Sequence, residues 1–88
     1  MTPISLFYGI IIYMYTDKGR EYKVPHIHAA FKDEEAVIAL TGETIDGRLN
    51  REKSALVQAW LIIHAEDLAA NWNVLKSGNE VFRIEPLR

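Results

Sequence analysis

Apolar and polar positions alternate with a period of two through the first half of the chain, and this alternation predicts β-strands. Three runs rich in β-branched and aromatic residues carry the pattern: residues 8–15 (YGIIIYMY), 26–32 (HIHAAFK) and 35–40 (EAVIAL). Polar segments separate these runs and predict a loop or a turn at each place: residues 16–23 (TDKGREYK), 33–34 (DE) and 41–43 (TGE). A short fourth strand is expected before Asp46-Gly47.

The second half of the chain changes to a helical period. Residues 55–63 (ALVQAWLII) are apolar almost all round, which indicates a helix that is buried on more than one side. Asn50 suits the N-cap position of this helical region, and Gly78 suits the C′ position. The pattern leaves open whether the segment between them forms one long helix or two helices broken near His64-Ala65.

Strands first and helix afterwards is the order that is typical of an α+β domain. Residues 81–86 (VFRIEP) add a candidate final strand. The prediction is a single domain over residues 1–88, with a small antiparallel or mixed sheet of three to five strands and one long or broken helix packed on one face. A chain of 88 residues can form one such core without disulfide bonds, and this chain contains no cysteine.

Neighbouring residues of a strand point to opposite faces of a sheet, so the alternation also assigns faces. The apolar face, which we expect to pack beneath Leu56, Trp60 and Ile63, comprises Ile10, Ile12, Met14, Ile27, Ala29, Phe31, Ala36, Ile38 and Leu40. The opposite face comprises Ile11, Tyr13, Tyr15, His26, His28, Lys32, Glu35 and Val37. Both histidines are therefore expected on the open face of the sheet, which the helix does not cover.

Composition narrows the classes of function. The net charge of -2 excludes the general attraction to nucleic acid of a strongly basic domain, although Lys18, Arg20 and Lys23 form a local basic cluster before the histidines. The longest apolar run, residues 4–15, has twelve residues, whereas a bilayer span needs about 20. Residues 1–3 (MTP) lack the basic start of a signal peptide. The expectation is a soluble, cytoplasmic protein with no membrane partner.

His26 and His28 are the leading candidates for chemistry. Side chains two apart on a strand leave the same face about 6.6 Å apart, because the rise is about 3.3 Å per residue. Two imidazoles at that spacing suit an acid and a base that promote attack of a 2′-hydroxyl on the adjoining phosphate of RNA. The candidates for contact with the phosphate or with a stacked base are Lys23, Lys32, Tyr13 and Tyr15. This mechanism needs no cofactor.

Two other functions would use the same pair or the same face. A metal site would need at least a third ligand, for which Glu35 is the first candidate, with His64 and Asp67 as others. No second spaced ligand motif supports this hypothesis. A binding or scaffold module would instead use Ile11 and the two tyrosines of the open face as its interface, and the histidines would be incidental. The residues alone do not choose between an enzyme and a binding protein.

The helical region contains weaker features. His64, Asp67 and Asn71 share a helix face at i, i+3 and i+7, and a buried, hydrogen-bonded histidine is favoured there over a site. Trp60 and Trp72 lie at helical spacing and are expected to belong to the core rather than to a ligand platform.

Several segments together resemble a known family. They are PISLFYGIIIYMY, PHIHAAF, EAVIALTGE, AWLIIHAEDLAANW and RIEPL, in this order and over nearly the whole chain. The combination is similar to the short bacterial proteins of domain-of-unknown-function family 4160. His26, His28, His64, Glu66 and Trp72 match the family pattern directly, whereas Val24-Pro25 stands where most members have two prolines.

The resemblance implies a partner rather than an activity. Genes of this family often lie beside a gene for another small protein, and such pairs are suspected to be toxin–antitoxin modules. The leading hypothesis is therefore the toxin-like half of a two-gene pair that acts on RNA through His26 and His28. The alternatives are a protein-binding module and, third, a metal-binding domain. The expected partners are the small protein encoded nearby, RNA, or a second copy of the chain.

Overall fold

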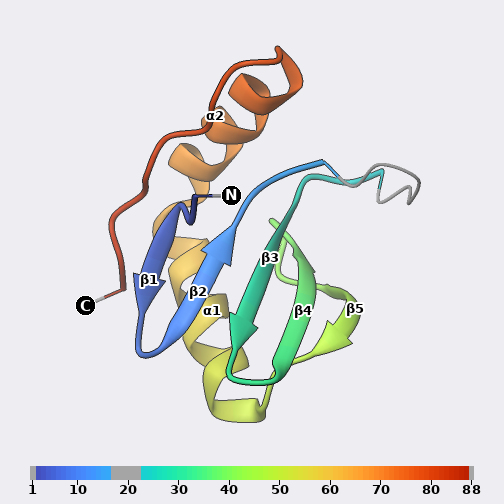
Figure 1. The fold of residues 1–88 in the computed structure, drawn as a ribbon, viewed down its shortest axis with the longest axis vertical. Helices are drawn as coiled ribbons and strands as arrows, with labels where there is room; N and C mark the ends of the chain where they lie inside the picture. The colour runs from blue at the N-terminus through green and yellow to red at the C-terminus, as the bar shows by residue number, and fades with distance from the viewer. Residues whose placement is uncertain (1, 17–22, 88) are drawn as a thin grey trace.

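The computed structural model describes residues 2–16 and 23–87, which form a five-stranded antiparallel sheet followed by two helices (Figure 1). The strands are β1 Ser5–Phe7, β2 Ile10–Tyr13, β3 His26–Phe31, β4 Glu34–Ala39 and β5 Thr44–Arg48. They lie in the sheet in the order of the sequence. Each strand therefore pairs with its neighbour along the chain, and the predicted α+β fold is confirmed.

A β-hairpin of β1 and β2 takes the place of the first predicted strand, and of residues 8–15 only 10–13 are in a strand. Tyr8 and Gly9 form its two-residue turn, with φ of 50° and 79°. Two consecutive residues with positive φ give a turn whose twist matches that of the flanking strands. The prediction of one continuous strand over residues 8–15 was wrong because a tyrosine in the sequence does not indicate a turn residue with positive φ. Leu6 thus pairs with Ile11 across a hairpin that the alternation pattern concealed.

Two other boundaries differ from the prediction. The β3–β4 turn comprises Lys32 and Asp33, one residue earlier than expected, and Lys32 has a φ of 54°. β5 continues through Asp46-Gly47 because Gly47, at a φ of 69°, accommodates an irregular edge strand beside the register shift at Val37/Ile38. The central part of the predicted 16–23 loop, with Lys18 and Arg20, lies outside the described residues.

The helical region consists of two helices, α1 Arg51–Ile63 and α2 Ala65–Lys76. The break is at His64, whose φ of -108° and ψ of 26° depart from helical geometry. Asn50 is the N-cap, as predicted, because its Oδ1 accepts from the Lys53 N–H at 2.9 Å. Gly78 occupies C′, as predicted, with a φ of 83° and its N–H bonded to the Leu75 carbonyl. No helix within the described ranges is long and apolar enough to cross a membrane.

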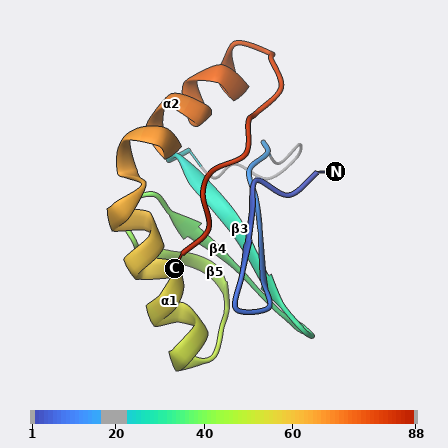
Figure 2. The ribbon, with the colours of Figure 1, turned by 90° about the vertical axis from the view of Figure 1, so that its left-hand side faces the viewer.

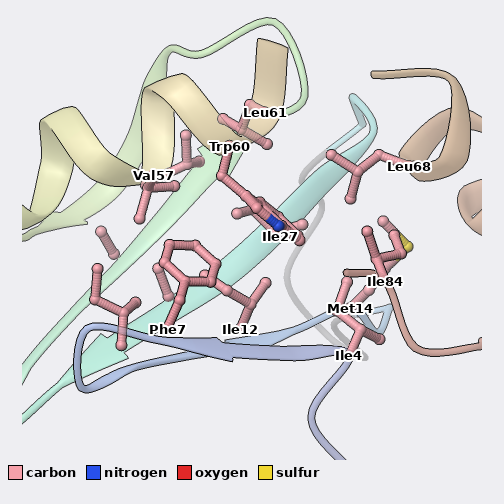
Figure 3. Close-up of a cluster of buried hydrophobic side chains, with 14 of the residues drawn as sticks. Ile4, Phe7, Ile12, Met14, Ile27, Val57, Trp60, Leu61, Leu68 and Ile84 are labelled. Carbon is pink, nitrogen blue, oxygen red and sulfur yellow. The ribbon is translucent and has the colours of Figure 1, made fainter. Parts of the chain in front are cut away.

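The core lies between the sheet and the helices, which occupy one side of it (Figures 2 and 3). The predicted apolar face is confirmed at its centre, where Ile27 pairs with Ile38 and both are fully buried. The helix residues that cover it are Val57, Trp60, Leu61 and Leu68. Ile63 was wrongly assigned to this face and is exposed. It lies six residues after Val57, about 120° around the helix from the buried side.

The C-terminal segment does not form the predicted strand. No ladder joins it to β1 among the described residues, although the Ile84 N–H donates to the Ile4 carbonyl at 2.8 Å, just before β1. Side chains of the helices hold it instead. The Trp60 indole N–H donates to the Glu85 carbonyl, and the fully buried Asn71 amide bonds both backbone groups of Phe82. The segment consequently runs back beside β1 (Figure 1).

Candidate functional site

His26 and His28 are buried, with exposed fractions of 1% and 3%. Strand alternation turns both away from Ile27, which packs in the core, so the predicted face is confirmed. The expectation that this face leaves them open to solvent is wrong. A reactant in solution does not reach either imidazole in this conformation.

The two histidines belong to a row of four aromatic rings, which we call the aromatic row: Tyr15, His28, His26 and Trp72. The Tyr15 and His28 rings are stacked, with centroids 3.9 Å apart and planes 7° apart. The His28 and His26 rings meet edge to face at 5.2 Å, and the His26 ring lies 5.1 Å from the Trp72 ring. The row thus connects the end of β2, through the start of β3, to α2.

A backbone hydrogen bond fixes the His26 ring. Its Nδ1 lies 2.8 Å from the Val24 carbonyl oxygen. A carbonyl oxygen only accepts, so Nδ1 carries a hydrogen and donates it to this oxygen. The bond and the Trp72 contact together hold the His26 ring in one orientation. A fixed orientation suits a side chain that supports the structure as well as a catalytic one.

The other predicted contacts for RNA are not all brought to the pair. Tyr13 stands opposite His28 on β2, and Tyr15 stacks on it. Lys32, however, lies in the turn at the far end of β3, four residues beyond His28 and about 13 Å along the strand. Its Nζ lies over the Phe31 ring at 5.3 Å. Lys23 precedes β3 and is exposed.

The proposed third metal ligand also lies elsewhere. In the register of the sheet, Glu35 of β4 stands opposite Ala30 of β3 and Arg48 of β5. His28 stands opposite Val37 instead. Within residues 2–16 and 23–87, no three side chains of His, Asp or Glu come close enough together to hold a metal ion. The described residues therefore offer no support for the site built on His26, His28 and Glu35.

His64 marks the break between the helices and is mostly buried. Its Nδ1 lies 3.8 Å from an Asp67 carboxylate oxygen, and its ring lies 5.8 Å from the Trp60 ring. Asn71, on the same predicted face, is engaged by Phe82 instead. The three residues are therefore not brought together as one site, and the 3.8 Å between His64 and Asp67 is longer than the hydrogen bond that the sequence favoured for this histidine.

Beside the aromatic row the structure contains an apolar groove of about 430 Å³, which we call the α2 groove. Three parts of the chain build it: the residues before β3, the β4–β5 connection, and α2. Its lining residues are Val24, Pro25, Ala39, Leu40, Thr41, Glu43, Ile45, Ala69, Trp72 and Asn73. Trp72, which was expected in the core, packs against its border, is half-buried and forms one wall of the groove.

Backbone hydrogen bonds hold the strand side of the α2 groove in place. The Leu40 N–H donates to the Pro25 carbonyl at 3.0 Å, and the Ala39 N–H donates to the Glu43 carbonyl at 2.8 Å. The Gln58 side chain of α1 donates to the Gly42 carbonyl at 2.6 Å and ties the turn to the helix. The hollow is therefore formed before any ligand arrives, as is usual for binding sites.

The α2 groove is mainly apolar. Among the described residues that line it, Glu43 is the only ionisable one. Val24 and Ile45 are exposed at its border, although both are large apolar side chains. Sequence reasoning missed this site because its members come from separate segments with no common spacing.

Both edges of the sheet are poorly suited to pairing with a strand of another protein. The C-terminal segment bonds the chain at Ile4, just before β1. At the other edge, β5 is irregular opposite Val37/Ile38, and the Asp46 side chain accepts from the Gly47 N–H at 2.8 Å. Bulges and occupied donors are common devices that keep an edge strand from pairing. The α2 groove is therefore the better candidate for recognition of a partner.

Comparison with known proteins gives one family and no relative of known activity. No curated protein and no solved structure matches the chain. A family model described as "Domain of unknown function (DUF4160)" matches residues 9–73. The matched range begins at the β1–β2 turn and includes the whole aromatic row, because Tyr15, both histidines and Trp72 lie inside it.

Proposed function

The chain belongs to the family described as domain of unknown function (DUF4160), and from that premise we propose that it is a protein-binding module rather than an enzyme. The α2 groove receives an apolar side chain of a small partner protein. The observation that carries this proposal is a preformed apolar hollow of about 430 Å³ with large apolar side chains exposed at its border. Burial of such groups supplies the main driving force of protein association.

In this proposal the His-x-His motif has a supporting role. His26 packs against Trp72, and His28 packs against His26, so the pair backs the wall of the groove. Tyr15 closes the other end of the row by stacking on His28. A half-buried tryptophan that its neighbours hold rigid is a typical binding anchor, because little conformational entropy is lost when a partner docks.

The groove also indicates the chemistry of the partner segment. An apolar anchor fits the lining, and a Lys or Arg beside that anchor would meet the Glu43 carboxylate at the border. The first candidate is a small protein encoded by a neighbouring gene, which is the kind of partner that the family resemblance implies. A toxin-like pair is compatible with this proposal if blockade by binding, rather than chemistry, produces the effect.

RNA cleavage by His26 and His28 remains the competing proposal. It requires the aromatic row to open, because both imidazoles are buried. It also requires a phosphate contact other than Lys32, which lies at the far end of β3. The purified chain is therefore expected to leave RNA intact. Fragmentation by wild type that disappears in a folded His28→Phe variant would favour the enzyme.

The binding proposal makes a quantitative prediction for the border of the groove. Calorimetric titration with the purified protein encoded beside this gene should give a dissociation constant that rises at least about tenfold in Ile45→Asp, because a charge replaces an apolar anchor contact. Glu43→Gln should weaken binding by about threefold, as expected for an exposed charge pair. Thr44→Asp is the matched control, since Thr44 is exposed and does not line the groove.

Circular dichroism of each variant shows whether the fold is intact. Equal affinity in wild type and Ile45→Asp would remove the α2 groove from the interface. No measurable binding of the neighbouring protein would contradict the proposed partner, and a screen of random peptides would then ask whether the groove selects an apolar residue beside Lys or Arg.

A further inference from the structure

The C-terminal segment is attached to the domain through its backbone. We call residues 79–87 the C-terminal strap, which runs from the end of α2 back along the molecule (Figure 2). The Asn71 amide bonds both backbone groups of Phe82, at 2.9 and 3.0 Å. The Trp60 indole N–H donates to the Glu85 carbonyl at 2.8 Å. Because these groups bond the main chain, they hold an extended segment in place without contacting its side chains specifically.

The C-terminal strap is loosely packed. Of its described residues only Ile84 is buried, with an exposed fraction of 5%. Three hollows lie along the strap: about 380 Å³ beside residues 79–81, about 320 Å³ beside residues 82–86, and about 300 Å³ beside residues 85–87. Each residue of the strap therefore borders a hollow. A segment with few buried apolar contacts belongs to the part of a fold that opens at low free-energy cost.

A tight turn joins α2 to the C-terminal strap. Gly78 has a φ of 83°, and the N–H of Asn79 donates to the Val74 carbonyl at 3.2 Å. Apart from its chain neighbours, no described atom lies within 4 Å of the position that a Cβ of residue 78 would occupy. The closed turn thus requires glycine for its backbone conformation and not for space. An open turn, in which residue 78 takes a negative φ, has no such requirement.

We propose that the C-terminal strap exchanges between two copies of the chain, so that each strap occupies the place of the other in a two-fold dimer. The structure shows what fits this place, because the strap itself lies in it, and a second copy carries the identical segment. Ile4 and Trp60, which bond the strap, lie far from it in the sequence. Their bonds are therefore the same whichever copy supplies the strap, and only the turn at Gly78 changes. Exchange of an identical element is a low-cost route to a dimer.

This proposal does not depend on the proposed function. Neither the strap residues nor the groups that bond them line the α2 groove. Failure of one proposal therefore leaves the other standing. The closed monomer should predominate in dilute solution, because the tethered strap has a high effective concentration at its own site. The exchanged dimer is expected at high protein concentration.

The turn gives the first test. Sedimentation equilibrium of the untagged chain from about 5 to about 200 µM should show a dimer whose dissociation constant is at least about tenfold lower in Gly78→Ala than in wild type. Alanine disfavours a positive φ, and each exchanged dimer opens two turns. Asn79→Pro removes the N–H that bonds Val74 and should act in the same direction. Ser77→Ala is the matched control, because Ser77 has a φ of -80° that alanine adopts without strain.

The strap gives the second test. Phe82 is 43% exposed on its outer side. An exchanged strap has the same surroundings in the monomer and in the dimer, so the effect of Phe82→Lys on the two states cancels. The dissociation constant should stay within about threefold of the wild-type value. A dimer that forms through the outer side of the strap would instead be weakened at least about tenfold, because a charge replaces an apolar contact.

Each outcome decides the proposal. Gly78→Ala and Asn79→Pro chains that both stay monomeric at the highest concentration overturn it. A dimer that Gly78→Ala does not strengthen, or that Ser77→Ala strengthens equally, shows that the positive φ of the turn does not control association. A dimer that Phe82→Lys weakens uses a surface contact instead of exchange. Circular dichroism confirms that each variant is folded, which is expected because every changed residue is exposed.

Discussion

Replacing Trp60 with alanine should lower the free energy of unfolding by about 4 kcal/mol, the typical cost of removing a buried tryptophan. Trp60 projects from α1 into the core and is fully buried, and its ring lies 5.3 Å from that of Phe7 (Figure 3). Its indole N–H also holds the C-terminal segment at the Glu85 carbonyl. A domain of this size has about 4 to 13 kcal/mol of stability in total, so this single change removes a large share.

Trp60→Phe separates the two contributions of the side chain. Phenylalanine retains a ring against Phe7 but lacks the N–H that Glu85 accepts, so we expect a smaller loss of about 1–2 kcal/mol. Urea unfolding followed by circular dichroism measures both variants. Equal stability of Trp60→Ala and wild type would show that the core is not centred on this residue.

Replacing His26 with alanine should lower the free energy of unfolding by about 2–3 kcal/mol, between the costs of small and large buried side chains. The ring is buried, contacts Trp72 and His28, and donates to the Val24 carbonyl. Its removal leaves a cavity and a carbonyl without this donor. An exposed catalytic histidine would instead contribute almost nothing to stability.

Lys32→Ala is the control for this prediction. Lys32 follows the other end of β3 and is exposed. Its Nζ lies 5.3 Å from the centre of the Phe31 ring. Its loss should change the unfolding free energy by no more than about 0.5 kcal/mol. A His26→Ala variant that is as stable as Lys32→Ala would contradict the supporting role of the aromatic row.

The period-two pattern predicted the faces of the central strands because alternation is a local property of an extended chain. It placed Ile27 in the core and both histidines on the other side. It did not predict that the histidines are buried, because their cover includes Tyr15 and Trp72, which come from different elements. Alternation states which way a side chain points and says nothing about what lies over it.

Local signals also explain which boundaries were found. Asn50 and Gly78 were predicted correctly because a cap depends on a few adjacent residues. The turn at Tyr8-Gly9 was missed because only one of its two left-handed residues is glycine. The α2 groove could not be predicted, since it forms only where separate segments meet, and hydrophobic periodicity does not distinguish a wall of a groove from a core position.

The central claim is that Trp72, backed by the histidines, forms the wall of a partner-binding groove. The chain contains two tryptophans, so a protein labelled with ¹⁵N at tryptophan gives two indole N–H signals in a nuclear magnetic resonance spectrum, which a Trp72→Phe variant assigns. Titration with the protein encoded beside this gene should shift the Trp72 signal and leave that of the buried Trp60 in place. Binding that leaves the Trp72 signal unchanged would contradict the claim.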